Sequence, residues 1–320
     1  MPYSLYRYKR SHYKQIWVKK EIWFKLKEEA DKKGMSIPGL LKYILECNKR
    51  ASVSIQEVNK EIERLKNIKQ LCEFILNSHN GRRMFNIVSR TWNPVSGCYH
   101  DCKYCWARKY ALQKLKHTKR YSKGFIPRLN TEEFKVKFNE EFVFVTDMGD
   151  LFGNWVKKEW ILKVIEHIKN FPRSYFLFLT KNPRRYHEFI DKFPENAILG
   201  ATIETNKDEL YLKHFISKAP LPSDRYEAMA SLNWKYKFIA IEPILDFDLE
   251  AFVKWIREIN PIMVYIGYDN YNNKLPEPSQ KKTLALIDKL SEFTLVIRKT
   301  IRPAWNEGML KYLPSQNVSS

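Results

Sequence analysis

The sequence predicts an α/β protein in which a parallel sheet follows a small N-terminal domain. Three observations support this fold class. Beyond residue 81, short apolar runs typical of buried strands alternate with helix-like segments. Six such repeats favour parallel strands, because parallel neighbours need a crossover between them. The first 50 residues follow a different pattern, and an amphipathic stretch joins the two parts. We expect the sheet to be doubly wound or curled into a partial barrel.

Residues 1–50 predict one short strand followed by two helices. Polar and apolar residues alternate over Gln15–Lys19, which is the period of a strand. A helix follows, and Gly34 is a typical C-terminal stop for it. Ser36 is a suitable N-cap for a second helix over residues 38–50.

The order strand, helix, Gly-x-Ser turn, helix resembles the ribbon-helix-helix family. The stretch that carries the resemblance is IWVKKEIWFKLKEEADKKGMSIPGLLKYIL. Such domains pair their strands across a dimer and lay the ribbon in the DNA major groove. The resemblance implies a homodimer and nucleic-acid contacts from Gln15, Trp17 and Lys19, although Trp17 departs from the usual polar reader. The alternative is a dimerisation module without nucleic-acid contact.

Residues 51–80 predict an amphipathic linker helix. Apolar residues recur at steps of three and four from Val53 to Ile75, so the helix could join the domains or form a coiled-coil seam. His79-Asn80-Gly81 breaks this pattern, and the larger domain is therefore expected over 81–320. Cys47 and Cys72 lie in helical segments and are expected to pack as small apolar residues.

The larger domain is expected to place its chemistry at the C-terminal ends of its strands, as parallel α/β folds do. Helices are predicted between the strands, for example over Lys157–Asn170 and Leu249–Ile259. The run Thr294–Ile297 is a candidate for a terminal strand. The six predicted strands are Phe85–Ser89, Phe142–Thr146, Tyr175–Thr180, Ala197–Thr202, Phe238–Ile241 and Ile262–Gly267.

The charge balance favours a polyanionic partner. The chain has 56 basic and 36 acidic residues, a formal net charge of +20. Nine basic residues and no acidic one lie between Lys103 and Arg128. Such an excess is typical of proteins that bind DNA or RNA, whereas the alternative is charge that maintains solubility alone.

Membrane and secretory segments are not expected. No apolar run approaches the ~20 residues of a membrane span. The basic N-terminus has no apolar segment behind it, so it does not predict a secretory signal. We therefore expect a cytoplasmic protein without a membrane partner.

The cysteines predict a metal cluster. An odd count of five argues against a disulfide framework. Cys98, Cys102 and Cys105 have the spacing Cys-x3-Cys-x2-Cys and follow the first predicted strand. Three thiolates can hold three corners of a [4Fe–4S] cluster and leave the fourth iron open to a small molecule. The alternative is zinc with His100 or His117 as fourth ligand, but zinc sites favour paired Cys-x2-Cys units.

This spacing, with an aromatic residue before the last cysteine, resembles the radical SAM superfamily. The segments TWNPVSGCYHDCKYCWA, VFVTDMGDLFG, FLFLTKNP, LGATIETN and IAIEPIL resemble a phage- and virus-associated branch over Arg83 to Ala304. The resemblance implies a partial (β/α)6 barrel with a [4Fe–4S] cluster and S-adenosylmethionine (SAM). It also implies an external electron donor, reductive cleavage of SAM and a 5′-deoxyadenosyl radical.

The same resemblance implies a set of SAM contacts. Met148, Gly149 and Asp150 stand where the superfamily has Gly-Gly-Glu, so Asp150 would hold the SAM ammonium; a helix N-cap is its alternative. A Lys181–Glu242 ion pair and an exposed Glu204 are alternatives for those residues. The remaining implied contacts are Tyr104 near the adenine, Thr202 and Glu204 near the ribose or methionine carboxylate, and Glu242 and Gly267 along the cofactor wall.

Three functions are compatible with these features. The first is a radical SAM enzyme that modifies or repairs nucleic acid. The second is a radical SAM enzyme acting on a small molecule or peptide. The third is a DNA-binding regulator that senses redox state through its iron–sulfur cluster. The extent of the SAM-site resemblance favours an enzyme, and the charge favours nucleic acid as its substrate.

Overall fold

The computed structural model describes residues 87–307 without interruption, and the chain forms two compact units, Met1–Asn67 and Ile68–Ser320. The unit boundary falls inside the predicted linker 51–80. The predicted contacts Gln15, Trp17 and Lys19, and also Cys47 and Cys72, lie outside the described residues. The described positions before residue 87 are 27–28, 30–32, 34, 36, 39, 66, 68–71, 73–75 and 85.

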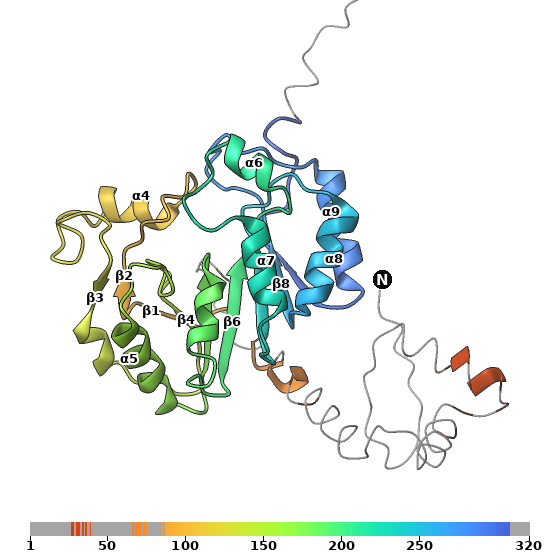
Figure 1. Ribbon diagram of the computed structural model, residues 1–320, viewed down its shortest axis with the longest axis horizontal. Helices are drawn as coiled ribbons and strands as arrows, with labels where there is room; N and C mark the ends of the chain where they lie inside the picture. Colours follow the sequence, from red (N-terminus) through yellow and green to blue (C-terminus); the bar gives the residue numbers. More distant parts are fainter. Residues whose placement is uncertain are drawn as a thin grey trace, which may run out of the picture. The chain divides into compact units, whose positions relative to one another are not determined.

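Seven parallel strands form the main sheet, and their spatial order follows the chain without a reversal (Figure 1). A doubly wound sheet needs a point at which the strand order reverses, with helices on both faces. The sheet is therefore a half-barrel, which decides between the two predicted architectures. Its strands are β1 (Arg90–Trp92), β4 (Phe142–Val145), β5 (Tyr175–Thr180), β6 (Ala197–Thr202), β7 (Lys237–Ile241), β8 (Met263–Ile266) and β9 (Leu295–Arg298).

The crossover segments cover the outer face of the sheet (Figure 1). Each main helix turns an apolar stripe inward; in α8, Phe252, Ile256 and Ile259 are fully buried. These side chains belong to the same buried cluster as alternate strand residues such as Ile239 and Ile241 of β7. The crossover helices are α5 (Lys158–Lys169), the 3₁₀ helix η3 (Pro183–Glu188), α6 (Asp208–Lys213), α7 (Pro222–Ala230), α8 (Leu249–Ile259) and α9 (Gln280–Ser291).

The concave face is filled by a second apolar cluster. Leu71 and Ile75 pack there with Phe85, whose ring lies 5.2 Å from Phe144 and 4.5 Å from Tyr265. This packing explains why the first predicted strand, Phe85–Ser89, is wrong. The apolar residues of that run fill the hollow of the sheet, and β1 begins only at Arg90.

The other predicted strands, the two predicted helices and the terminal strand are confirmed. In the part of the chain described, no helix is long and apolar enough to cross a membrane. The connection from β1 to β4 holds the cysteines and a two-stranded antiparallel sheet. Its elements are β2 (Val95–Ser96), α4 (Trp106–Gln113), β3 (Arg128–Leu129) and the 3₁₀ helix η2 (Thr131–Lys135).

Candidate active site

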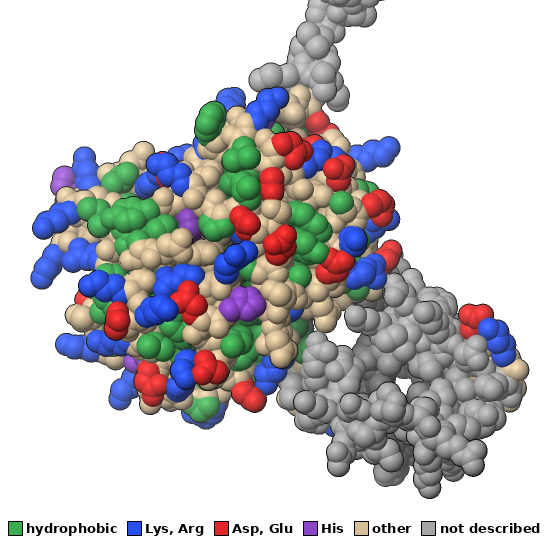
Figure 2. Space-filling view, in the orientation of Figure 1, with side chains coloured by type: hydrophobic (Ala, Val, Ile, Leu, Met, Phe, Trp, Pro, Cys, Tyr) green, Lys and Arg blue, Asp and Glu red, His purple; other side chains and the backbone are tan. Residues whose placement is uncertain are grey.

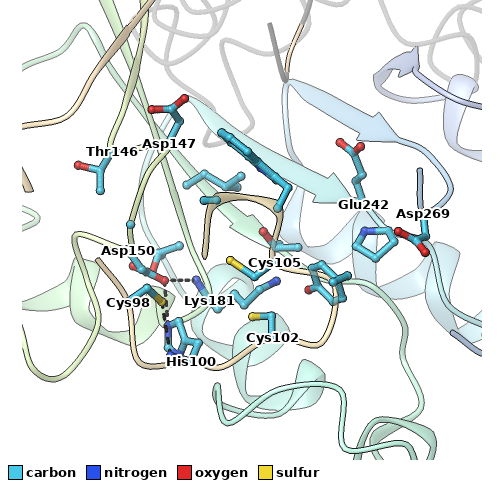
Figure 3. A pocket seen from close by; sticks show the side chains of 18 of the residues that line it. Cys98, His100, Cys102, Cys105, Thr146, Asp147, Asp150, Lys181, Glu242 and Asp269 are labelled. Carbon is cyan, nitrogen blue, oxygen red and sulfur yellow. Dashed lines mark hydrogen bonds and ion pairs between the residues drawn. The ribbon is translucent and has the colours of Figure 1, made fainter. Parts of the chain in front are cut away.

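A cavity of about 320 Å³ lies at the C-terminal edge of the half-barrel (Figure 3). One part of its wall is the cysteine segment that follows β1. The other part is made of residues at the ends of the later strands, from Thr146 after β4 to Lys299 after β9. This is the edge at which the sequence predicted the chemistry.

A tight turn brings the cysteine segment to the cavity. Gly97 has a φ of +87°, and a Cβ atom at this position would lie 2.3 Å from the carbonyl carbon of Ile126. Only glycine fits both the backbone conformation and the close approach. The Gly97 N–H donates to the Met148 carbonyl, and Gly97 bridges to Gly149. The turn therefore fixes the cysteine segment against the end of β4.

The three predicted ligand cysteines line the same cavity. Cys98 Sγ accepts a hydrogen bond from the His100 N–H at 3.4 Å, and Cys105, the N-cap of α4, accepts one from the Arg108 N–H at 3.3 Å. Cys102 Sγ lies 3.2 Å from Ser217 Oγ. Burial raises the pKa of all three thiols. Thiolates here therefore need a cation, which iron would supply.

The described residues do not assemble a zinc site around either histidine. His100 Nε2 lies 2.9 Å from Asp150 Oδ2, and His117 is exposed and does not line the cavity. In the described residues, no three His, Cys, Asp or Glu side chains could hold a single metal ion. Three thiols from one short segment, facing one cavity, fit the cluster that their spacing predicts.

Asp150 is buried, and each of its two carboxylate oxygens has two hydrogen-bond partners in the protein. Oδ1 accepts from Thr180 Oγ1 at 2.7 Å and from the Phe152 N–H at 3.0 Å. Oδ2 accepts from the Lys181 N–H and pairs with His100, both at 2.9 Å. Burial alone would raise the pKa of Asp150, but these bonds, above all that from His100, bring the pKa below its usual range.

The helix N-cap alternative for Asp150 is wrong, because the bond to Phe152 closes a turn and α5 begins only at Lys158. The carboxylate instead ties the cysteine segment, through His100, to the ends of β4 and β5 (Figure 3).

Glu204 is fully buried and holds two cations. Oε1 accepts from Lys181 Nζ at 2.6 Å and from the Tyr104 hydroxyl, while Oε2 accepts from Arg225 Nη1 at 2.6 Å. Burial would raise its pKa, but Arg225 and then Lys181 lower it to about 2. The alternative of an exposed Glu204 is therefore wrong. Its carboxylate positions Lys181 and Tyr104, which themselves line the cavity.

A second carboxylate, Glu242, directly follows β7, and its partner Lys299 directly follows β9. Glu242 Oε1 accepts from Lys299 Nζ, and Glu242 Oε2 is buried without a hydrogen-bond partner. The ion pair suggested for Lys181 and Glu242 is thus wrong, since each pairs with a different residue. Burial raises the pKa of Glu242, and Lys299 opposes this effect.

The predicted cofactor residues divide into two groups. Met148 is buried against Cys98 and Cys105, Glu204 lies behind Lys181, and Gly267 lies beside Lys299; these three do not line the cavity. Those that do line it are Cys98, Cys102, Tyr104, Cys105, Gly149, Asp150, Thr202 and Glu242.

Sequence reasoning missed three residues of this site: Ser217, Arg225 and Lys299. Lys299 could have been found, because it follows a predicted terminal strand just as Glu242 follows Ile241. Ser217 and Arg225 lie in the long crossover between β6 and β7, and no local pattern marks them.

Comparisons with known proteins relate the chain to one family. The sequence model of a family described as "Protein of unknown function (DUF5131)" matches residues 84–257. No curated protein matches the sequence.

Solved structures of spore photoproduct lyase have a similar arrangement. One mutant aligns with a TM-score of 0.48 and 12% identity, over 65% of this chain and 76% of that chain. The lyase complexed with dinucleoside spore photoproduct aligns with a TM-score of 0.43 and 12% identity, over 64% and 62%. A mutant with bound AdoMet and the same dinucleoside aligns with 0.42 and 12%, over 64% and 61%. The chain thus spans less than two thirds of the two ligand-bound structures.

Proposed function

The chain belongs to the DUF5131 family of proteins of unknown function, and from this premise we propose that it is a radical SAM enzyme acting on nucleic acid. The observation that carries the proposal is the meeting of Cys98, Cys102 and Cys105 in one cavity at the C-terminal edge of a parallel half-barrel. The Cys-x3-Cys-x2-Cys spacing supplies the three ligands of a site-differentiated cluster, and the cavity supplies room for a second small molecule.

When bound, the cluster and SAM supply a carbon radical that removes a hydrogen atom from the substrate. The protein's own groups hold and tune the ligands. Backbone N–H groups donate to the sulfurs of Cys98 and Cys105, and such bonds stabilise negative charge on the thiolates. Asp150 fixes the cysteine segment through His100. The apolar side chains of Phe125, Trp106 and Leu179 help exclude water from the cavity.

The cofactor end of the cavity is the part nearest the cysteines. Tyr104 and Thr202 line it and are available to contact SAM, as is the backbone of Gly149. The Asp150 carboxylate already has four partners, so its contribution to the SAM ammonium would come through the geometry of this segment. Lys181, held by Glu204, adds a positive charge that suits a carboxylate group of the ligand.

Charge and exposed aromatic residues support a nucleic-acid substrate. Figure 2 shows Lys and Arg side chains projecting on the side of the molecule where α4 lies. Tyr99 and Tyr110 are about half exposed, at 51% and 48%, in the same connection as the nine basic residues between Lys103 and Arg128. Cations bind phosphates and aromatic rings stack on bases, a combination typical of nucleic-acid surfaces.

Reconstitution tests the enzyme class. Wild-type protein, loaded anaerobically with iron and sulfide and reduced with dithionite, should convert SAM to methionine and 5′-deoxyadenosine. Cys98→Ala, Cys102→Ala and Cys105→Ala should each abolish iron binding and SAM cleavage. Cys47→Ala and Cys72→Ala are matched controls that should retain both. Wild-type protein that purifies with stoichiometric zinc and takes up no iron–sulfur cluster would overturn the proposal.

A second measurement tests the substrate. Formation of 5′-deoxyadenosine is compared with and without duplex and single-stranded DNA or RNA at physiological salt. We expect single-stranded or flipped bases to raise turnover, because a stacked base cannot enter the cavity. If only a small metabolite or a peptide raises turnover, the nucleic-acid substrate is wrong. A cluster that forms without SAM cleavage would indicate a redox-sensing regulator instead.

A further inference from the structure

The cavity has a second polar end, on the side away from Cys98 and Asp150 (Figure 3), that the proposed cofactor chemistry does not use. Glu242 and Lys299 line it at the ends of β7 and β9. Figure 3 shows Glu242 and Asp269 on one side of the cavity, with Cys98, His100 and Asp150 on the other. The two ends can therefore serve different ligands.

Glu242 presents an unmatched acceptor. Its side chain is 8% exposed, and Oε2 is buried without a hydrogen-bond partner, while Oε1 is held by Lys299. A buried carboxylate oxygen without a partner is energetically unfavourable. A ligand that brings an N–H group to this oxygen would remove that penalty.

Lys299 presents donors beside that acceptor. Its ammonium has three N–H groups, and Glu242 Oε1 is its one hydrogen-bond partner among the described residues. The absence of a side chain at Gly267 leaves room for the Lys299 side chain, since a Cβ atom at position 267 would lie 3.1 Å from Lys299 Cβ. The neighbouring Asp269 is not available, because its carboxylate accepts from the Tyr271 N–H and from Asn273.

An acceptor beside a donor fits an N–H group next to a carbonyl. Among bases, uracil, thymine, guanine and hypoxanthine have this pair of groups on a ring edge, and both hydrogen bonds would be charge-assisted. Apolar and aromatic side chains suit a flat ring: Phe144 and Leu179 line the cavity, and Tyr271 is 64% exposed at its edge.

We propose that Glu242 and Lys299 bind the lactam edge, N–H beside C=O, of an unpaired nucleobase and so select the substrate. The inference rests on the proposed nucleic-acid function and adds the class of base. The same edge forms Watson–Crick pairs, so a base within a duplex cannot present it. It also assigns Glu242 to the substrate rather than to the SAM wall that the sequence resemblance implies.

The test compares two RNA decamers at physiological salt with the full-length, cluster-loaded protein. One is made of uridine, and the other of 3-methyluridine, which lacks the ring N–H. Phosphate contacts, including any from the N-terminal residues, are common to both and cancel in the ratio of affinities. We expect wild-type protein to bind the uridine decamer about 10- to 100-fold more tightly, the range for a hydrogen bond to a charged group.

Glu242→Gln should lower this preference, because a neutral amide oxygen accepts a weaker hydrogen bond from the ring N–H than a carboxylate does. The control Glu195→Gln alters an exposed Lys–Glu pair near the amino end of β6 and should leave it unchanged. SAM affinity should be the same in wild type and Glu242→Gln, and Glu195→Gln should retain substrate-free SAM cleavage.

Equal binding of both decamers by wild-type protein, or an unchanged preference in Glu242→Gln, would refute the inference. So would loss of SAM binding in Glu242→Gln, since Glu242 would then be a cofactor residue. Decamer binding is measured with and without SAM. A wild-type protein that binds with the expected preference but never cleaves SAM would contradict the proposed function and leave the base-binding site standing.

Discussion

The buried pair of Glu204 and Arg225 allows a stability prediction that can be calculated from the structure. Both side chains are 0% exposed, and Lys181 is 12% exposed. Glu204→Gln keeps the shape of the side chain but leaves two cations without a counter-charge. The pKa of Glu204 falls from 4.5 to about 2 on folding, which at about 1.4 kcal/mol per pH unit corresponds to about 3 kcal/mol. Removal of one partner from a buried pair typically has a similar effect, about 3–5 kcal/mol.

The pH dependence of this contribution has a definite sign. Because the carboxyl pKa is lower in the folded state, its stabilisation is fully present above pH 4.5 and is lost as the pH falls towards 2. Wild type and Glu204→Gln should therefore differ by about 3 kcal/mol at pH 7 and converge in acid. For a domain of this size, the difference corresponds to a melting temperature lower by about 6–12 °C.

Urea denaturation of the metal-free protein, followed by tryptophan fluorescence at several pH values, measures this difference. Glu195→Gln is the matched control, since Glu195 is 91% exposed in its pair with Lys235 and should change stability little. Adding Arg225→Met to Glu204→Gln should recover part of the stability, because an unpaired buried cation is then removed. A difference between wild type and Glu204→Gln below about 0.5 kcal/mol at pH 7, or one that does not shrink in acid, would refute the reasoning.

Three further predictions concern the cysteine segment and the basic surface. Gly97→Ala should lower the iron bound per chain, because its Cβ would meet Ile126 at 2.3 Å. The control Gly124→Ala, also at positive φ but with its nearest neighbour at 4.0 Å, should retain iron. Equal iron in both variants would contradict this account of the turn. Asp150→Asn should also lower the iron content, since one amide oxygen cannot replace the two carboxylate oxygens. These oxygens hold His100, Thr180 and the N–H groups of Phe152 and Lys181. Unchanged iron content and stability would mean that these bonds do not position the cysteine segment. Replacing Lys114, Lys116 and Lys119 with Gln should make the affinity for duplex DNA less dependent on salt. The slope of log affinity against log salt concentration should fall in magnitude by about 0.9 for each phosphate that the variant no longer neutralises. An unchanged slope would place the DNA-binding surface elsewhere.

The sequence allowed the strand positions to be predicted because each is a short buried run between turn signals. In β4, Val143 and Val145 meet the outer helices while Phe142 and Phe144 fill the concave face, so both faces demand apolar residues. The same reasoning misplaced the first strand. Phe85 is as apolar as a strand residue, but it is buried by insertion into the barrel rather than by pairing.

The sharing of one cavity by the three cysteines could be predicted because their spacing is local. The partners of the charged residues could not, because they come from distant segments. Lys181 precedes both Glu204 and Glu242 in sequence, and only the fold decides that it pairs with Glu204, which also binds Arg225 from the crossover after β6. Asp150 lines the same cavity as the cysteines, but its bond to His100 depends on the fold of two separate loops.

The half-barrel also has a consequence for how the protein behaves in concentrated solution. Its edge strands β1 and β9 each pair on one side only within the described sheet. Free edges can join strands of neighbouring molecules and seed aggregation. Both edges are short, with three residues in β1 and four in β9, and an arginine stands on each, Arg90 at the start of one and the exposed Arg298 at the end of the other. Short, charged edges discourage edge-to-edge association, so the sheet can remain open without a strand to close it.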